Sequence, residues 1–247
     1  MKMPLVLLPG LLCDDAVWSG QCDSLAERAD CTIPDYGHCK SITEMAELAL
    51  SSARAGRFAL AGHSMGGRVA LEVVRLAPTR VLGLALLDTG YQAIVDGDAG
   101  QRERDERLRL LEIARDKGMR DMGEQWAPGM VHPDRLGAPV YQAVLDMIAR
   151  STPEKFEAQI AALLGRPDAS DLLPRIACPT MIICGREDLW SPLSRHEVMH
   201  RAVADSTLRV IEDCGHMSTM EQPNAVTAAF MEWIDRIQSL KDQGNET

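Results

Sequence analysis

Six short apolar runs alternate with helical stretches along this chain, and the alternation restricts the possible fold more than any other feature. The expected helices 41–55, 67–76 and 225–240 have apolar residues at helical spacing. Parallel strands joined by crossover helices produce this pattern. We therefore predict an α/β fold, a three-layer α/β/α sandwich with a mostly parallel sheet of about six strands. The expected strands lie at residues 5–8, 32–34, 58–61, 81–87, 180–184 and 207–211.

A long middle segment breaks this rhythm. It is rich in Arg, Glu, Met and Leu and carries several Gly and Pro turn signals. Its helical patterns at 101–117, 139–150 and 153–164 alternate charged with apolar residues, as helices half-facing solvent do. The chain is accordingly predicted to be a single domain over residues 1–247. Its core would be 1–90 and 176–240, with a helical cap inserted at 91–175.

Composition excludes several classes of function. Of the 247 residues, 46% are hydrophobic, which fits a soluble globular domain. The net charge of -10, without a basic tract, disfavours nucleic-acid binding. The apolar run 5–12 is too short to span a membrane and does not fit a signal peptide. Seven cysteines without a Cys-x-x-Cys pair fit reduced thiols, so we expect a cytoplasmic protein without a metal site.

A Gly-His-Ser-Met-Gly motif at residues 62–66 stands between an expected strand and an expected helix. The glycines relieve crowding in a tight turn that holds Ser64 in a strained conformation with its hydroxyl exposed. The helix start directs N–H groups, Met65 first, at charge developing on a substrate oxygen. This is the context of a nucleophile elbow. We predict Ser64 as the nucleophile and the Met65 N–H as one oxyanion donor.

With this motif, the chain from Pro4 to Ile237 resembles the α/β-hydrolase superfamily, specifically its small carboxylesterase-like branch with a helical cap. In that family the first strand leads into a His-Gly turn whose next residue supplies a second oxyanion N–H. Here the first apolar run leads into Pro9-Gly10-Leu11, so the resemblance implies that Leu11 is this donor. Leu12 is the alternative. Pro9 replaces the histidine, so any buttressing of the loop by that side chain is lost or moved.

The segment at residues 185–192 directly follows an expected strand and resembles the family's Gly-x-x-Asp-x-x-x-Pro segment. A carboxylate at Asp188 can accept the Nδ1 proton of a histidine, fix its tautomer and stabilise the imidazolium. Glu187 beside it and Asp88, which follows an earlier strand, are alternative positions for this acid. The resemblance favours Asp188.

The catalytic base is expected on a loop after the last strand. His216 lies in an Asp-Cys-Gly-His segment that follows the run 207–211, as the family's Gly-His segment does. The chain order Ser, Asp, His agrees with α/β-hydrolases and not with chymotrypsin-like or subtilisin-like enzymes. Of the other histidines, His63 should pack beside the elbow. His196 and His200, four residues apart, are interpreted as a helix surface, because no carboxylate follows to complete a metal motif.

Substrate selection is expected mainly in the cap, where apolar side chains either line an acyl pocket or pack the cap onto the sheet. Four cap arginines are interpreted mainly as a solvated helix face with local ion pairs. One of them could bind a substrate carboxylate; they are Arg102, Arg104, Arg107 and Arg109. The residues predicted to contact substrate are Leu12, Trp126, Trp190 and Met217.

These observations predict a serine hydrolase that cleaves small to medium carboxylic esters, thioesters or lactones through a Ser-His-Asp triad and an acyl-enzyme. No cofactor is implied, and a monomer or homodimer is expected. The same triad could serve carbon–carbon hydrolysis, lyase or synthase chemistry, or perhydrolysis, because the fold supports many reactions. A non-catalytic small-molecule receptor is the third possibility.

Overall fold

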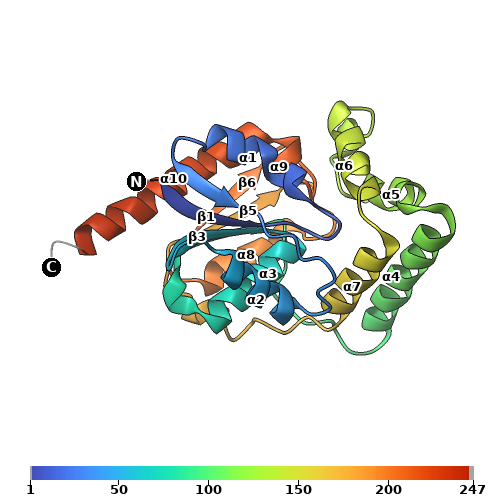
Figure 1. Cartoon of the computed structure of the whole chain (residues 1–247), viewed down its shortest axis with the longest axis horizontal. Helices are drawn as coiled ribbons and strands as arrows, with labels where there is room; N and C mark the ends of the chain where they lie inside the picture. Colours follow the sequence, from blue (N-terminus) through green and yellow to red (C-terminus); the bar gives the residue numbers. More distant parts are fainter. Residues whose placement is uncertain (1, 245–247) are drawn as a thin grey trace.

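A sheet of six parallel strands forms the centre of the molecule. Figure 1 shows the computed structural model, which describes residues 2–244. Their order across the sheet is β2-β1-β3-β4-β5-β6, and every pairing is parallel. The predicted α/β fold with about six strands is confirmed. The strands are β1 (Met3–Leu8), β2 (Ala29–Thr32), β3 (Phe58–His63), β4 (Val81–Leu87), β5 (Thr180–Gly185) and β6 (Ser206–Ile211).

Helices cover both faces of this sheet, which gives the three predicted layers. One face carries α1 (Ser19–Ser24), α9 (Ser218–Glu221) and α10 (Pro223–Gly244) (Figure 1). The other carries α2 (Ile42–Ser52), α3 (Met65–Leu76) and α8 (Leu193–Ala202). All residues of β3, β4 and β5 are buried, because a parallel sheet is covered on both sides.

Two parts of the sheet and its helices differ from the expected boundaries. β2 lies at Ala29–Thr32 rather than 32–34. As an edge strand it is only partly buried, so its sequence lacks the apolar run that marks the central strands. The short helices α1 and α9 were not anticipated, since six or fewer residues give almost no periodicity.

The segment between β4 and β5 forms four α-helices that stand to one side of the sheet (Figure 1). Three of them match the expected helices to within three residues, and α5 was not anticipated. Pro occupies the first turn of α6 and of α7, where its missing N–H costs nothing. The helices are α4 (Asp98–Lys117), α5 (Met119–Trp126), α6 (Pro139–Ala149) and α7 (Pro153–Leu164).

This helical segment touches the core at loops that follow the strands. The Met130 carbonyl accepts a hydrogen bond from the His216 N–H at 2.7 Å. Gln159 on α7 accepts one from the Leu12 N–H at 2.8 Å. A cleft bounded by the carboxyl ends of parallel strands is where α/β folds bind ligands, so these contacts surround the expected site.

Within residues 2–244, no helix combines the length and apolar character that crossing a membrane requires.

Candidate active site

Ser64 lies at a sharp turn between β3 and α3. Its φ of 53° is in the left-handed region, which a serine adopts only under strain. The turn leaves no room for side chains at its flanks. A Cβ on Gly62 would lie 2.2 Å from the Gly66 carbonyl oxygen, and one on Gly66 would lie 2.1 Å from the Leu8 carbonyl oxygen. The sequence therefore needs glycine at both positions to present the Ser64 hydroxyl.

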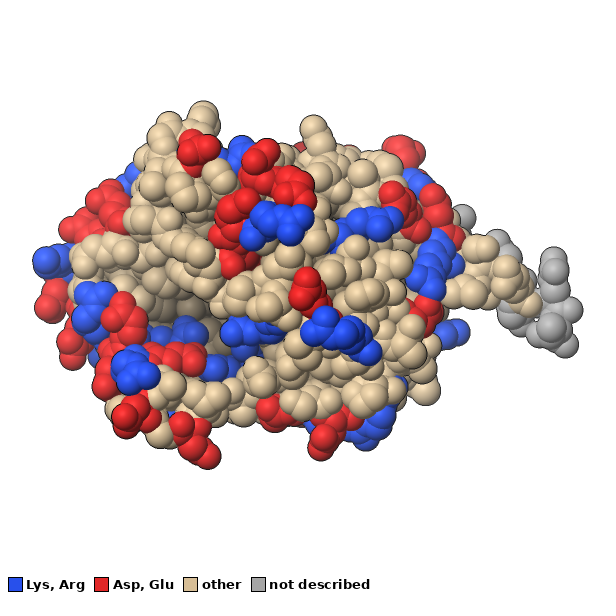
Figure 2. Space-filling view, turned by 180° about the vertical axis from the view of Figure 1, so that it is seen from behind, with Lys and Arg blue, Asp and Glu red and all other residues tan. Residues whose placement is uncertain are grey.

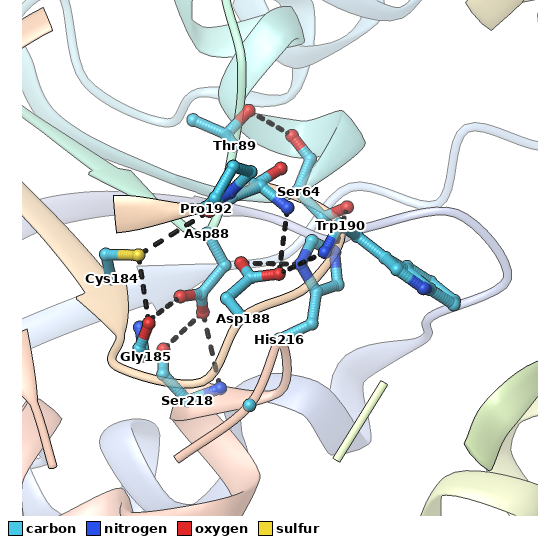
Figure 3. Close-up of polar contacts among 12 residues, drawn as sticks. Ser64, Asp88, Thr89, Cys184, Gly185, Asp188, Trp190, Pro192, His216 and Ser218 are labelled. Carbon is cyan, nitrogen blue, oxygen red and sulfur yellow. Dashed lines mark hydrogen bonds and ion pairs between the residues drawn. The ribbon is translucent and has the colours of Figure 1, made fainter. Parts of the chain in front are cut away.

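The three residues proposed from the sequence as a triad meet at the carboxyl end of the sheet (Figure 3). Nε2 of His216 lies 2.8 Å from Oγ of Ser64, and Nδ1 lies 2.9 Å from Oδ2 of Asp188. The other carboxylate oxygen of Asp188 accepts the N–H groups of Trp190 and Ser191 at 2.9 and 2.8 Å. These bonds fix the carboxylate. Because a carboxylate only accepts, the contact with Asp188 assigns the Nδ1–H tautomer to His216. The Nε2 atom is then free to accept a hydrogen bond from the Ser64 hydroxyl.

Burial and the neighbouring charge shift the pKa values of His216 and Asp188 in opposite directions. Burial disfavours protonated His216, but the charge and hydrogen bond of Asp188 outweigh it, so the pKa of His216 lies above its usual value. Burial also disfavours the Asp188 anion. The charge and hydrogen bond of His216 and the two N–H donors outweigh that, so the pKa of Asp188 is lowered. The arrangement stabilises an imidazolium next to a carboxylate.

Asp88, the alternative acid, is buried nearby but makes no hydrogen bond to His216. Its carboxylate accepts the Gly185 N–H at 3.0 Å and both the N–H and the hydroxyl of Ser218. Burial and the neighbouring Asp188 raise the pKa of Asp88 to about 8. Glu187, the other alternative, accepts the Cys214 N–H instead. Both carboxylates brace the loops that carry Asp188 and His216.

One group of potential metal ligands occurs among the described residues: Asp88, Cys184 and Asp188. Its chemistry does not fit a metal. The Cys184 thiol donates to the Gly185 carbonyl, and burial raises its pKa far above the usual value. Asp88 is bound by three donors and Asp188 is engaged by His216. A metal requires deprotonated ligands with free lone pairs, and this cluster is already committed to internal hydrogen bonds.

Two backbone N–H groups next to Ser64 have no acceptor within residues 2–244: those of Leu11 and Met65. A Cβ on Gly10 would lie 3.2 Å from Cβ of Ser64, so the turn that carries Leu11 packs directly against the serine. The Leu12 N–H donates to Gln159 instead. Of the two residues considered for the second oxyanion donor, Leu11 is thus the one whose N–H is available.

Two buried side chains hold the loop that carries His216. His63, at the end of β3, packs beside the elbow as expected, and its Nε2 lies 2.8 Å from the His216 carbonyl oxygen. Burial and the nearby His216 lower the pKa of His63 to about 3, so it is neutral and donates this bond. Glu221 accepts the N–H groups of Gly215 and Met217 at 3.0 and 3.2 Å.

The interpretation of His196 as a surface residue is wrong. His196 is fully buried, and its Nε2 accepts the Thr89 N–H at 3.0 Å while Nδ1 faces the Pro192 carbonyl. Burial lowers the pKa of His196 to about 4. The apolar residues of α8 give a weak periodic pattern, so the sequence did not reveal that this histidine faces the sheet.

A cavity of about 500 Å³ lies above Ser64 and His216, between the core and the helical segment. Trp126 and Trp190, two of the predicted substrate contacts, line it and stack on each other with ring centroids 5.0 Å apart. The Trp190 ring also lies 5.1 Å from the His216 ring. The other two predicted contacts are elsewhere: Leu12 lines a neighbouring cavity of about 300 Å³, and Met217 is buried outside the lining of both.

Four arginines also line the large cavity: Arg68, Arg107, Arg166 and Arg195. In Figure 2 the side where the helical segment meets the core is hollowed, and basic side chains lie at the edge of the hollow. Of the cap arginines considered from the sequence, only Arg107 lines it. Arg68, Arg166 and Arg195 were missed. The available signal was the position of Arg68, one helical turn after Ser64 on the same helix face.

Comparison with known proteins finds similar chains among esterases and hydrolases. A pimeloyl-[acyl-carrier protein] methyl ester esterase from Nitrosomonas europaea is 26% identical over 239 residues, covering 92% of this chain and 93% of that protein. A 2-hydroxy-6-oxononadienedioate/2-hydroxy-6-oxononatrienedioate hydrolase from a Pseudomonas species is 27% identical over 179 residues, covering 71% of this chain and 62% of the relative.

Among solved structures, a thermophilic esterase from Thermogutta terrifontis, with malate bound, superimposes with a TM-score of 0.85. It is 29% identical, and the match covers 96% of this chain and 91% of that one. The sequence model described as the alpha/beta hydrolase family matches residues 5–230, from the first strand into the last helix. The chain therefore belongs to the alpha/beta hydrolase family and is a hydrolase of the α/β fold.

Proposed function

We propose that this protein is a serine hydrolase that cleaves small to medium carboxylic esters or thioesters through Ser64, His216 and Asp188. The observation that carries the proposal is the continuous hydrogen-bond chain from the Ser64 hydroxyl through both His216 nitrogens to Asp188, at 2.8 and 2.9 Å. A nucleophile, its base and the group that orients the base are the parts that acyl transfer requires.

The proposed reaction has two halves. His216 Nε2 takes the Ser64 proton as Oγ attacks the substrate carbonyl, and the oxyanion accepts the N–H groups of Leu11 and Met65. The imidazolium, stabilised by Asp188, then protonates the leaving alkoxide or thiolate, which leaves an acyl-enzyme. In the second half water attacks the acyl group, its proton passes to His216, and the Ser64 oxygen leaves with that proton. Each half returns His216 to neutrality, so neither a metal nor a cofactor is needed.

The proposal also covers the division of the chain, its compartment and its partners. We place the functional division at a core of residues 1–90 and 176–240 and a cap of 91–175, since the cavity lies between these parts. The seven cysteines are all free, which supports a reducing compartment, the cytoplasm. The partner is a small-molecule ester, and the protein acts as a monomer or homodimer without nucleic acid or membrane.

The test is turnover of p-nitrophenyl acetate and butyrate by the wild type and by Ser64→Ala. We expect the variant to lose at least about 10³-fold in kcat, because the triad acts as one unit. Ser51→Ala, a change on the exposed side of α2, is the matched control and should keep full activity. Labelling of Ser64 by a fluorophosphonate checks the nucleophile separately. Absence of both labelling and turnover would contradict the proposal and favour a receptor.

Carbon–carbon bond hydrolysis is the second candidate. It is supported by the Pseudomonas relative, which is named as a dienedioate hydrolase, and by the basic side chains in the cavity. Assay of a 2-hydroxy-6-oxo-dienedioate beside the p-nitrophenyl esters separates the two reactions. A kcat/KM at least about 10²-fold higher for the 2-hydroxy-6-oxo-dienedioate than for either ester would replace the esterase proposal with this one.

A further inference from the structure

Two guanidinium groups flank Gly90, which lies three residues after β4 on the wall of the large cavity. A Cβ on Gly90 would lie 2.7 Å from Nη2 of Arg68 and 3.3 Å from Nη1 of Arg195. The two nitrogens are therefore no more than about 6 Å apart, a span that one carboxylate bridges with two charge-assisted hydrogen bonds. Arg68 comes from α3 and Arg195 from α8, so two separate helices direct positive charge at one point.

Neither arginine has a carboxylate partner among residues 2–244. Arg68 donates to the Gln92 carbonyl at 2.7 Å, and Arg195 donates to the Trp190 carbonyl and the Ser191 hydroxyl at 3.2 and 3.4 Å. These acceptors are neutral. A cation withdrawn from water is normally paired with an opposite charge, since an unpaired cation in a low-dielectric site is costly.

The other charges in the cavity do not supply the missing acid. Glu103 binds Arg166 with both oxygens, at 2.7 and 2.8 Å, and one of these oxygens also binds Arg107. Glu106 is engaged by Arg109 on the exposed side of α4. The lining thus has four arginines against two glutamates, within a chain whose net charge is -10.

The crowding of positive charge also acts on Arg68 itself. Burial, followed by the guanidinium groups of Arg166 and Arg195, lowers the pKa of Arg68 to about 9. Arg68 therefore remains a cation at neutral pH. A bound anion would relieve both the repulsion and the loss of hydration.

We propose that Arg68 and Arg195 form a carboxylate subsite, and that the substrates are esters or thioesters that carry a second, free carboxylate. This proposal rests on the hydrolase function proposed above and specifies its substrate class. Apolar side chains also line this cavity, so we expect a short hydrocarbon segment to join the carboxylate to the scissile carbonyl. These side chains are Leu110, Trp126, Phe156 and Leu163.

Matched pairs of anionic and neutral esters test the proposal. For a carboxylate on the acyl side, mono-4-nitrophenyl glutarate is compared with 4-nitrophenyl valerate. For one on the alcohol side, 4-acetoxybenzoate is compared with its methyl ester. We expect a preference for the anion of at least tenfold in kcat/KM in one pair. Arg68→Met and Arg195→Met should each reduce that preference by about 10- to 100-fold, mainly through KM.

Two control variants show whether the loss of preference for anionic esters is specific to Arg68 and Arg195. Arg104→Met removes a cation from the exposed face of α4, outside the cavity lining, and should leave the preference unchanged. Arg68→Lys keeps the charge but not the fork of donors, so it should retain more of the preference than Arg68→Met. Equal kcat/KM values within both ester pairs, with Ser64-dependent turnover intact, would overturn the carboxylate subsite and leave the hydrolase proposal standing.

Glutarate binding to Ser64→Ala, measured by calorimetry, tests the subsite without catalysis. We expect binding that weakens at least tenfold when Arg68→Met or Arg195→Met is added. Binding that is absent, or unchanged by both substitutions, would overturn the subsite. Because this readout needs no turnover, it separates failure of the subsite from failure of the esterase reaction.

Discussion

The His63 ring donates from Nε2 to the His216 carbonyl oxygen over 2.8 Å, so the histidine of the elbow holds the loop that carries the proposed base. Both residues are buried, with His63 fully inaccessible and His216 2% exposed. The turn with Ser64 and the loop with His216 come from sequence positions more than 150 residues apart. This bond joins the His63 side chain, next to Ser64, to the backbone of the loop that carries His216.

Replacing His63 with Ala should destabilise the fold and misplace His216. We expect a loss of about 2–4 kcal/mol of unfolding free energy, from the cavity and the lost hydrogen bond together. The kcat for p-nitrophenyl butyrate should fall about tenfold, because the Ser64–His216 geometry loosens. Urea denaturation and steady-state kinetics measure both. His38→Ala, at an exposed position, is the control; an unchanged kcat in His63→Ala would refute the bracing role.

The pH dependence of turnover should report the pKa of His216. Protonated His216 cannot accept from Ser64, so kcat/KM should fall as the pH drops through that pKa. Because Asp188 raises this pKa against the effect of burial, the midpoint of the acid limb is expected above about 6.5. Asp188→Asn removes the charge, so the midpoint should move to lower pH while kcat drops. A midpoint that stays in place would show that another group controls it.

Gly66→Ala should disrupt the elbow, since the new methyl group would meet the Leu8 carbonyl oxygen at 2.1 Å. That backbone atom belongs to a central strand and cannot move cheaply. We expect at least about 2 kcal/mol of destabilisation, in the range of core overpacking, and loss of fluorophosphonate labelling at Ser64. Gly56→Ala places its methyl group in open space and should be neutral. Equal urea midpoints for the two variants would contradict this account.

Glu221→Gln should weaken the loop around His216. The glutamate accepts N–H groups of His132, Gly215 and Met217, and an amide has only one oxygen to offer them. We expect the free energy of unfolding to fall by about 1.5–3 kcal/mol. Hydrogen bonds to a charged acceptor are lost, and the new amide points its NH₂ group toward N–H donors. Differential scanning calorimetry measures it, with the exposed Glu232→Gln as control. A change in the free energy of unfolding below about 0.5 kcal/mol would refute the role of Glu221 in holding this loop.

The parts that the sequence predicted share one property: each depends on local turn chemistry or strand–helix alternation. The Gly-x-Ser-x-Gly turn shows where Ser64 lies, and the glycines before His216 and Asp188 mark loops after strands. The central strands were located because burial on both faces requires continuous apolar runs. The edge strand β2 and the short helices lack such a signal.

The parts that the sequence could not predict depend on contacts between distant segments. Arg68 and Arg195 lie on different helices and meet only because β4 and β5 are neighbours in the sheet. Likewise, the buried His196 accepts a hydrogen bond from the Thr89 N–H, over 100 residues away in the sequence. Leu12 and Met217 were predicted as substrate contacts and lie near the site in sequence, but neither lines the large cavity. Sequence proximity does not state which way a side chain points.

The helical segment leaves the core after β4 and returns at β5, and these two strands pair side by side. The sheet itself therefore fixes the positions of both ends of the segment. Lengthening a segment whose ends are fixed adds only about 0.6 kcal/mol of loop-closure entropy for each doubling of its length. Evolution could thus exchange the whole segment, and with it much of the wall that faces the substrate, while the sheet and the turn at Ser64 stay as they are.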